Sequence, residues 1–310
     1  MKRKVIGIGE TVLDIIFKDG KPLNAVPGGS TFNAMISLGR SGIPTTFLSE
    51  AGDDRIGEFV IDFLRNNGVD ADKVSIYPGM KSPLSLAFLD KDNIPDYVFY
   101  KDNKVTVPEF NYPDIQPDDI VLFGSYYAIN PEKRTVVNDF LNFARERGAI
   151  LYYDVNFRSS HRNDIMKITP NLIDNLEFAD IVRGSDEDFD IIYKKSDPDL
   201  VYKAEISFYC KTFICTCGSN PVVVHSANDY RNEYPVTKAE TVSTIGAGDN
   251  FNAGFIYGMI KNNITRNDIE RGLTETEFNS LIESAQMFAS ECCKDIYNYV
   301  SPEFGNKNKL

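Results

Sequence analysis

The sequence predicts an α/β protein in which a doubly wound, mostly parallel sheet carries helices on both faces. The first observation behind this prediction is the regular alternation of short apolar strands and helices from residue 120 onward. The second is that several residues suited to ligand binding fall at or soon after the carboxyl ends of predicted strands: Asp14, Asn156, Arg158, Ser185 and Gly218. Because ligands of such sheets bind at the carboxyl ends of the strands, we expect these residues to converge on one crevice.

The N-terminal part of the chain predicts a buried strand followed by a hairpin. Residues 4–9 form an apolar run that is typical of a buried strand. The Gly7-x-Gly9 pair in this run lacks a third glycine, because Val12 stands at that position, and this argues against a dinucleotide-binding loop. Residues 12–27 hold two apolar runs on either side of a Lys-Asp-Gly-Lys turn, which predicts a hairpin. Asp14 lies inside the first run, where a buried carboxylate needs a polar partner or a ligand.

The remaining elements follow from apolar periodicity and from helix start and stop signals. A helix is expected from Ser30 to Arg40, with Ser30 as its N-cap, and an amphipathic helix begins near Ile56. Strands are expected at 44–49, 84–89, 97–100, 120–124, 149–157, 181–184 and 212–218. Between the later strands we expect a helix from about Pro131 to Arg147, a short helix near Leu172 and helices up to Cys210. The tail at 305–310 is expected to be disordered.

Composition excludes several classes of partner and site. The chain has 310 residues with 33 Lys and Arg against 45 Asp and Glu, a net charge of -12, so a basic face for nucleic acid is not expected. Glu10 and Asp14 interrupt the first apolar run too early for a signal peptide, and no stretch suits a membrane span. Five cysteines do not make a disulfide framework, so we expect reduced thiols and a cytoplasmic location.

The stretch STIGAGDNFNAGF at residues 243–255 combines a turn, a helix start and a carboxylate. Gly246, Ala247 and Gly248 leave the backbone nearly bare at the helix start, so three successive N–H groups could face one anion, for which phosphate is a natural candidate. Asp249 follows in the first turn, where it could accept a proton from an attacking hydroxyl. Taken alone, the motif is also typical of a tight loop with an acidic helix start.

A second motif lies at residues 27–39, PGGSTFNAMISLG, where Gly28 and Gly29 again precede a helix. The two stretches resemble the two signatures of the PfkB (ribokinase-like) carbohydrate kinases. The matching positions are Gly28, Gly29, Asn33, Leu38 and Gly39 for the first signature, and Thr244, Gly246, Ala247, Gly248, Asp249, Phe251, Gly254 and Phe255 for the second. Gly9-Glu10-x-x-x-Asp14 and Asp154-x-Asn156-x-Arg158 agree with the same family, so the resemblance spans nearly the whole chain.

The resemblance implies a ribokinase-like fold in one domain, residues 1–310, with a small β lid formed by strands from about 12–27 and 83–107. It implies a phosphotransferase that uses ATP, in which Asp249 is the base and Gly246, Ala247 and Gly248 form the anion hole. The other residues that it implies are Asp14, Gly28, Gly29, Asn33 and Arg158 for the sugar, and Thr216 and Gly218, with Gly246 and Gly248, for the nucleotide. Mg²⁺ is expected on the nucleotide, held largely through water, with Asp188 contributing indirectly.

Substrate choice within the family rests on weaker features. The Gly9-Glu10 opening, Ser185 and the run from Asp154 to Arg158 resemble fructokinases and 2-keto-3-deoxygluconate kinases more than ribokinases. We therefore expect fructose as substrate and fructose 6-phosphate as product, with 2-keto-3-deoxygluconate kinase, ribokinase and nucleoside kinase as alternatives. A sugar-binding regulator is the alternative outside enzymes, and an intact Asp249 argues against it. Exposed lid edges also suggest a homodimer formed through the lids.

Two local features carry further expectations. Ser243 stands where potassium-activated members of the family carry Asp, so we expect weak or absent activation by potassium. Cys215 and Cys217 are expected on opposite faces of one strand, which would make a metal site from this pair difficult and favours simple packing.

Overall fold

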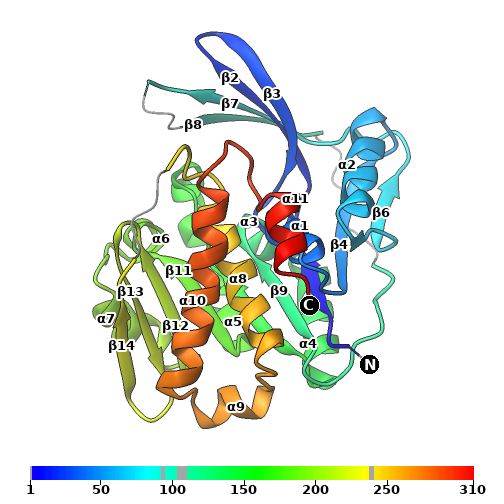
Figure 1. The fold of residues 1–310 in the computed structure, drawn as a ribbon. Coiled ribbons are helices and arrows are strands. Elements are labelled where there is room, and N and C mark those ends of the chain that lie inside the picture. Colours follow the sequence, from blue (N-terminus) through cyan, green and yellow to red (C-terminus); the bar gives the residue numbers. More distant parts are fainter. Residues whose placement is uncertain (1, 92–94, 103–109, 237–240) are drawn as a thin grey trace.

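The computed structural model describes residues 2–91, 95–102, 110–236 and 241–310. Its main sheet contains ten strands. All pairs in it are parallel except at one edge, where one strand, β13, runs antiparallel to both of its neighbours (Figure 1). The strand order is β14 (Tyr230–Tyr234), β13 (Asn220–Ser226), β12 (Thr212–Cys217), β11 (Ile181–Ser185), β10 (Ile150–Asp154), β9 (Ile120–Gly124), β1 (Val5–Ile8), β4 (Thr45–Gly52) and β5 (Val69–Asp70), and β6 (Val74–Tyr77) also pairs with β4.

Helices cover both faces of this sheet, which confirms the predicted fold class. One face carries α1 (Ser30–Arg40), α2 (Arg55–Asn66), α8 (Ala247–Lys261), α9 (Arg266–Arg271), α10 (Glu275–Cys292) and α11 (Pro302–Lys307). The other carries α3 (Ser125–Ile129), α4 (Arg134–Glu146), α5 (Ile165–Phe178), α6 (Asp186–Tyr193), α7 (Pro198–Val201) and the π-helical turn Tyr202–Ile206, and a 3₁₀ turn spans Ser159–Asp164. Adjacent strand residues such as Val5 and Ile6 enter opposite apolar cores, because side chains alternate across a sheet.

A second, four-stranded sheet projects beyond the main sheet (Figure 1). Its order is β3 (Lys21–Gly28), β2 (Val12–Lys18), β7 (Leu84–Leu89) and β8 (Pro95–Tyr100). The pairs β2–β3 and β7–β8 are antiparallel, whereas β2 and β7 run parallel in the middle. These strands coincide with the expected lid segments, although residues 103–107 of the second segment lie outside the described residues.

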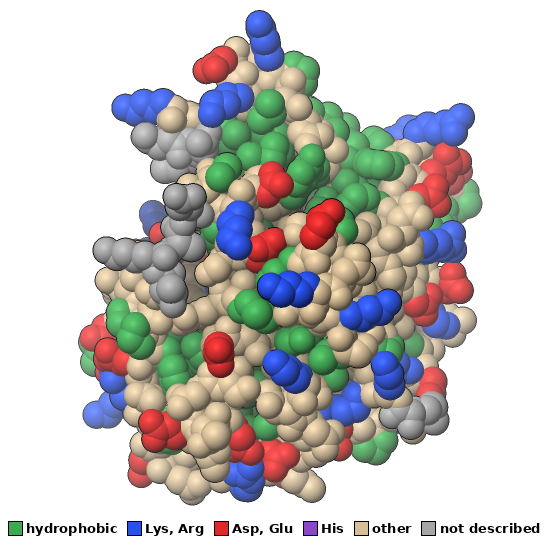
Figure 2. Space-filling view, viewed as in Figure 1, with side chains coloured by type: hydrophobic (Ala, Val, Ile, Leu, Met, Phe, Trp, Pro, Cys, Tyr) green, Lys and Arg blue, Asp and Glu red, His purple; other side chains and the backbone are tan. Residues whose placement is uncertain are grey.

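The projecting sheet has only a small apolar core and carries exposed apolar side chains. Its buried residues are Ile16, Val26 and Ala87. Figure 2 shows hydrophobic side chains on this sheet and around its base, whereas charges of both signs are scattered over the body. The large exposed apolar residues of these strands are Leu23, Phe88, Val98, Phe99 and Tyr100.

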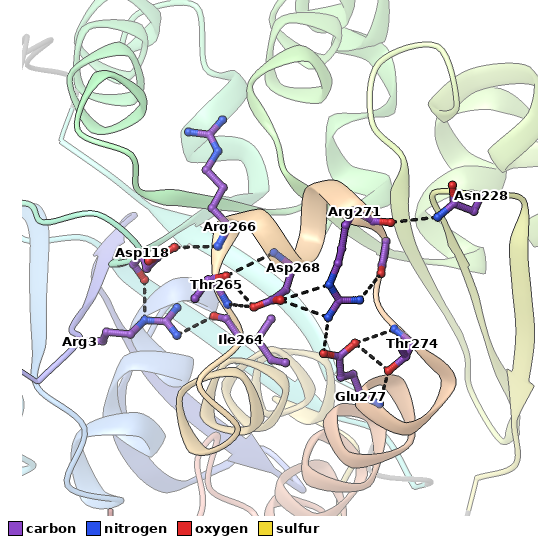
Figure 3. A network of polar contacts seen from close by, with 11 residues as sticks. Arg3, Asp118, Asn228, Ile264, Thr265, Arg266, Asp268, Arg271, Thr274 and Glu277 are labelled. Atoms are coloured by element: carbon purple, nitrogen blue, oxygen red, sulfur yellow. Dashed lines mark hydrogen bonds and ion pairs between the residues drawn. The ribbon is translucent and has the colours of Figure 1, made fainter.

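The amino ends of the strands are tied together by polar contacts (Figure 3). The Arg3 guanidinium donates to the carbonyl oxygens of Asp118 at 2.7 Å and Ile264 at 2.6 Å. The N–H of Arg266 donates to the Asp118 carboxylate at 2.7 Å. These contacts join the start of β1, the start of β9 and the start of α9, so they stabilise this end of the sheet.

Three local predictions were wrong or incomplete. The C-terminal residues are ordered: α11 packs Gly305 against Arg40, and the N–H of Leu310 donates to the Ser41 carbonyl at 3.1 Å. Ser30 is not the N-cap of α1, because Gly29 takes that place and Ser30 is the first helical residue. The elements that were not predicted are β5, β6, β13, β14, α3, α9, α10 and α11, and α5 is longer than the short helix expected.

Within the described ranges, none of the helices combines the length and the apolar composition that a membrane span requires.

Candidate active site

The glycine loop before α8 has the geometry that a helix-start anion site needs. Gly246 is the N-cap residue and has a positive φ of 77°. A Cβ at this position would lie 2.6 Å from the carbonyl oxygen of Asn298, so both the backbone conformation and the space require glycine.

Of the three successive N–H groups that were expected to face an anion, one has a partner inside the loop. The Ala247 N–H donates to the Thr244 carbonyl at 3.1 Å, so this donor is used inside the turn. Helical bonding begins with the Asn250 N–H, which donates to the Gly246 carbonyl at 2.9 Å. In the described part of the chain, the N–H groups of Gly248 and Asp249 therefore have no carbonyl acceptor, as expected for donors at a helix start that can bind an anion.

The Asp249 carboxylate is held by two side chains of α1. The Ser30 hydroxyl donates to Oδ1 at 2.7 Å, and the Asn33 amide donates to Oδ2 at 2.8 Å. Burial raises the pKa of Asp249 to about 6; the negative charge of Asp154 adds to the rise, and the two hydrogen bonds oppose it. The carboxylate is therefore mostly ionised at neutral pH and is a better proton acceptor than an ordinary Asp.

Asp14 is buried at the base of the projecting sheet. The Ser85 hydroxyl donates to its Oδ1 at 2.6 Å, and the Asn298 amide reaches its Oδ2 at 3.4 Å. Burial raises the pKa of Asp14. A Cβ on Gly28 would lie 2.5 Å from the Asp14 carboxylate, so glycine leaves room for this group.

Gly29 links this corner to the start of α1. Its φ is 127°, and a Cβ there would lie 2.3 Å from the carbonyl oxygen of Glu10. The N–H of Asn33 donates to the Gly29 carbonyl at 2.8 Å, which places the Asn33 side chain one turn into the helix.

Positive charge reaches the same corner from two segments. Arg158 follows β10, and its guanidinium lies 5.8 Å from the centre of the Phe99 ring. Its positive charge opposes the rise that burial causes in the pKa values of Asp14 and Asp249. Lys101 follows β8 and forms an ion pair with Glu10 at 2.8 Å. This ion pair joins the projecting sheet to the loop after β1.

A buried arginine that sequence reasoning did not single out lies under the glycine loop. Arg183 on β11 pairs with Asp154, the last residue of β10, at 3.0 Å and donates to the Thr216 hydroxyl of β12 at 2.6 Å. The Thr216 side chain is therefore engaged within the sheet. Gly218, just past β12, has a φ of 59°, and a Cβ there would meet nothing within 4 Å.

The Asp188 carboxylate accepts hydrogen bonds from backbone N–H groups. Its Oδ1 accepts the N–H of Phe157 at 2.7 Å, and its Oδ2 accepts the N–H of Ser185 at 2.7 Å as part of a capping box. Burial raises the pKa of Asp188 to about 6. Among the described residues, no cluster of His, Cys, Asp and Glu side chains has the arrangement of a metal site.

The expectation that Cys215 and Cys217 lie on opposite faces of their strand was wrong, although both pack in or against the apolar core as expected. The Sγ atoms of Cys215 and Cys217 lie 4.0 Å apart, because residues two apart in a strand share a face and the register shifts between them. All five cysteines are free thiols.

The structure thus joins most of the predicted residues into one polar network around the start of α8. Ser30 contacts both Asp249 and Asp154, and Asp154 leads through Arg183 to Thr216. Asp14 reaches the same helix start through Asn298, whose carbonyl accepts the Asn250 amide. Sequence reasoning missed Ser30, Ser85, Arg183 and Asn298. The spacing of Ser30 and Asn33, three residues apart on one helix, was a usable signal for the first, whereas the other three depend on strand order or on distant segments.

A family model described as pfkB family carbohydrate kinase matches residues 2–292. The chain belongs to the PfkB family of carbohydrate kinases. Members are phosphotransferases that use a sugar hydroxyl as acceptor, so this protein is a sugar kinase.

Named relatives in the family carry different substrate assignments. The chain is 26% identical to Fructokinase-1 of Zea mays over 88% of the chain and 87% of that protein. It is 27% identical to 5-dehydro-2-deoxygluconokinase of Geobacillus thermodenitrificans over 75% of the chain and 72% of that protein.

Solved structures agree on the fold. Aminoimidazole riboside kinase from Salmonella enterica, complexed with aminoimidazole riboside and an ATP analog, superposes with a TM-score of 0.81 at 19% identity and covers 99% of each chain. Fructokinase from Xylella fastidiosa with bound ATP superposes with a TM-score of 0.81 at 18% identity, over 99% of this chain and 98% of that one.

Proposed function

We propose that this PfkB kinase transfers the γ-phosphate of ATP to a primary hydroxyl of fructose and forms fructose 6-phosphate. The observation that carries the proposal is the Asp249 carboxylate, which Ser30 and Asn33 hold beside the Gly248 and Asp249 N–H groups. A base and an anion-binding helix start then lie within one helical turn, as in-line phosphoryl transfer requires. Similarity to the maize fructokinase supports fructose as the sugar.

In this mechanism Asp249 accepts the proton of the attacking hydroxyl. Asp14 accepts hydrogen bonds from other sugar hydroxyls. Gly28 keeps the space beside its carboxylate open, and Gly29 lets the chain pass close to the Glu10 carbonyl. Asn33 orients the Asp249 carboxylate, and Arg158 supplies positive charge near both ligands. The four-stranded sheet is the lid that covers the sugar and excludes water, a competing acceptor.

The nucleotide side is compatible with ATP carrying its own Mg²⁺. Mg²⁺ retains several waters and needs only phosphates and a small number of carboxylates, so a protein cage is not required. Gly246 and Gly248 contact the phosphates, and the open backbone at Gly218 leaves space for the nucleotide at the end of β12. Since both Asp188 oxygens accept backbone N–H groups, this residue acts on the metal only through water.

A sugar acid such as 2-keto-3-deoxygluconate is the second candidate. Lys101 and Arg158 bring two positive charges toward the sugar side, which would suit a carboxylate. The ion pair between Lys101 and Glu10 offsets one of them, so the neutral sugar remains our first choice.

The test is ADP release from ATP and Mg²⁺ with fructose, 2-keto-3-deoxygluconate, ribose or adenosine as acceptor. We expect turnover with fructose and a fall in kcat of about 10²–10⁴-fold in Asp249→Asn, the range for a lost general base. Asp62→Asn, on the exposed side of α2, is the control and should retain kcat. Turnover of another acceptor would replace fructose, and sugar binding without ADP release would favour a regulator.

We also propose that two copies pair through their lids. Leu23, Phe88, Val98 and Tyr100 are exposed apolar side chains on the lid strands, and among the described residues no further strand pairs with the outer edge of β3 or β8. A monomeric mass by light scattering at assay concentration would contradict this pairing.

A further inference from the structure

Arg183 lies directly behind the loop that is proposed to bind the transferred phosphate. A Cβ built on Gly248 would lie 3.1 Å from both Nη1 and Nη2 of Arg183. The guanidinium therefore contacts the Gly248 backbone on its inner side. Since the guanidinium also lies 5.7 Å from the centre of the Phe251 ring in the same helix, it packs under the first turn of α8.

The hydrogen bonds of Arg183 hold it in this position and leave one donor unused. Nη1 pairs with Asp154 and Nη2 donates to Thr216, so strands on both sides of β11 hold the guanidinium. Its Nε is buried and has no partner in the described part of the chain. An arginine that only neutralised Asp154 would not need contact with the glycine loop.

The charges around the loop require a buried cation once ATP is present. Asp154 and Asp188 both act on Arg183, and Asp154 also acts on Asp249 at the start of α8. The phosphates of ATP would add further negative charge. Arg183 is buried among these groups, and the surrounding carboxylates raise its pKa, so it stays protonated. Charge of one sign fixed beside a site of developing opposite charge stabilises a transition state without reorganisation.

We propose that Arg183 is a functional residue of phosphoryl transfer, which supplies the buried positive charge behind the Gly246–Gly248 loop and stabilises the phosphoryl group during transfer. This inference rests on the proposed phosphate-binding role of the loop. It assigns to β11 a function beyond the ion pair with Asp154.

The test compares neutral and charged replacements of Arg183 by steady-state kinetics. Arg183→Gln removes the charge, and its shorter side chain does not reproduce the contacts that Nη1 and Nη2 make with Asp154 and Thr216. We expect kcat to fall about 100-fold or more, the scale for loss of one electrostatic donor to the transition state. The KM for sugar should change little. Arg183→Lys, which retains the charge, should recover a large part of kcat.

A double variant separates the electrostatic role from a structural one. Asp154→Asn with Arg183→Gln leaves no unpaired buried charge, so a purely structural ion pair predicts that kcat returns to the wild-type value. Our proposal predicts that kcat stays low. The same double variant serves if Arg183→Gln alone does not fold.

Two further measurements complete the comparison. The control is Arg134→Met, because Arg134 is also buried but bonds Asn175 and Asp174 away from the loop. We expect this variant to be less stable and to keep the wild-type kcat per folded molecule. The kcat of each variant is taken on its high-pH plateau, where Asp249 is ionised. Wild-type kcat in Arg183→Gln or in the double variant would overturn the proposal, whereas an inactive wild-type enzyme would overturn the proposed function instead.

Discussion

The hydrogen bond from Ser30 to Asp249 should set the acid limb of the pH–rate profile. The wild-type limb should follow the Asp249 pKa of about 6. Ser30→Ala removes the donor that lies 2.7 Å from Oδ1. A hydrogen bond to a charged group contributes about 1.5–3 kcal/mol and one pKa unit corresponds to about 1.4 kcal/mol, while water at the crevice replaces part of the loss. We therefore expect the limb to move up by about one pKa unit.

The predicted loss depends on pH in a specific way. With a limb that moves from about 6 to about 7, the ionised fraction falls from about 90% to about 50% at pH 7 and from about 50% to about 10% at pH 6. At pH 8.5 the two enzymes should differ by less than about 10% from this cause. The kcat/KM for sugar is measured by ADP release between pH 5 and about 9, with saturating ATP.

A matched control is Ser280→Ala. It removes a hydroxyl on α10 that accepts a hydrogen bond from Asn262 at 2.9 Å, and Ser280 itself lies outside both signatures. The acid limb of the pH–rate profile of Ser280→Ala should stay at the wild-type position. An unmoved limb in Ser30→Ala would show that another group, such as Asp14, controls the acid side of the profile.

Three further predictions concern stability, sugar binding and cations. Because the pKa of Asp249 in the folded protein lies above its ordinary value, the free energy of unfolding decreases as the pH rises from about 4 to about 6. Relative to the wild type, Asp249→Asn should therefore raise the free energy of unfolding by about 1–2 kcal/mol at pH 8 but by little at pH 4.5. Urea unfolding at both pH values measures this difference. Gly28→Ala should push against the Asp14 carboxylate and raise the KM for sugar by about tenfold, and an unchanged KM would contradict the proposed pocket. Ser243 offers a hydroxyl that already accepts the Ile245 N–H at 3.2 Å, so exchange of sodium for potassium should leave the rate nearly unchanged, and a several-fold increase would refute this.

The sheet and both glycine loops could be predicted because their signals are local. Buried parallel strands read as apolar runs, and a glycine loop before a helix is visible in a short stretch of sequence. In contrast, β14 has the sequence YRNEY and alternates between half-buried and exposed positions, so its apolar signal is weak. The start of α11 had a readable signal, since Ser301 caps it and Pro302 stands at its first position.

The role of Arg183 could not be found from sequence for a topological reason. Its partners Asp154 and Thr216 lie on the neighbouring strands β10 and β12, and they meet only because these strands flank β11 in the sheet. A single arginine in a short apolar strand does not reveal that order. Asn298 is similar, because it contacts Asp14 from a segment 284 residues away in the chain.

The position of Asn298 matters for the choice of the C-terminal end of any truncated form of this protein. Its carbonyl accepts the Asn250 amide at 2.8 Å and abuts Gly246, while its own amide reaches Asp14. One residue thus connects the Gly246–Gly248 loop to Asp14, yet it lies beyond residue 292, where the family match ends. A fragment that ends at this boundary would retain both signatures and Asp249, but would lack the residue that connects the two halves of the candidate site.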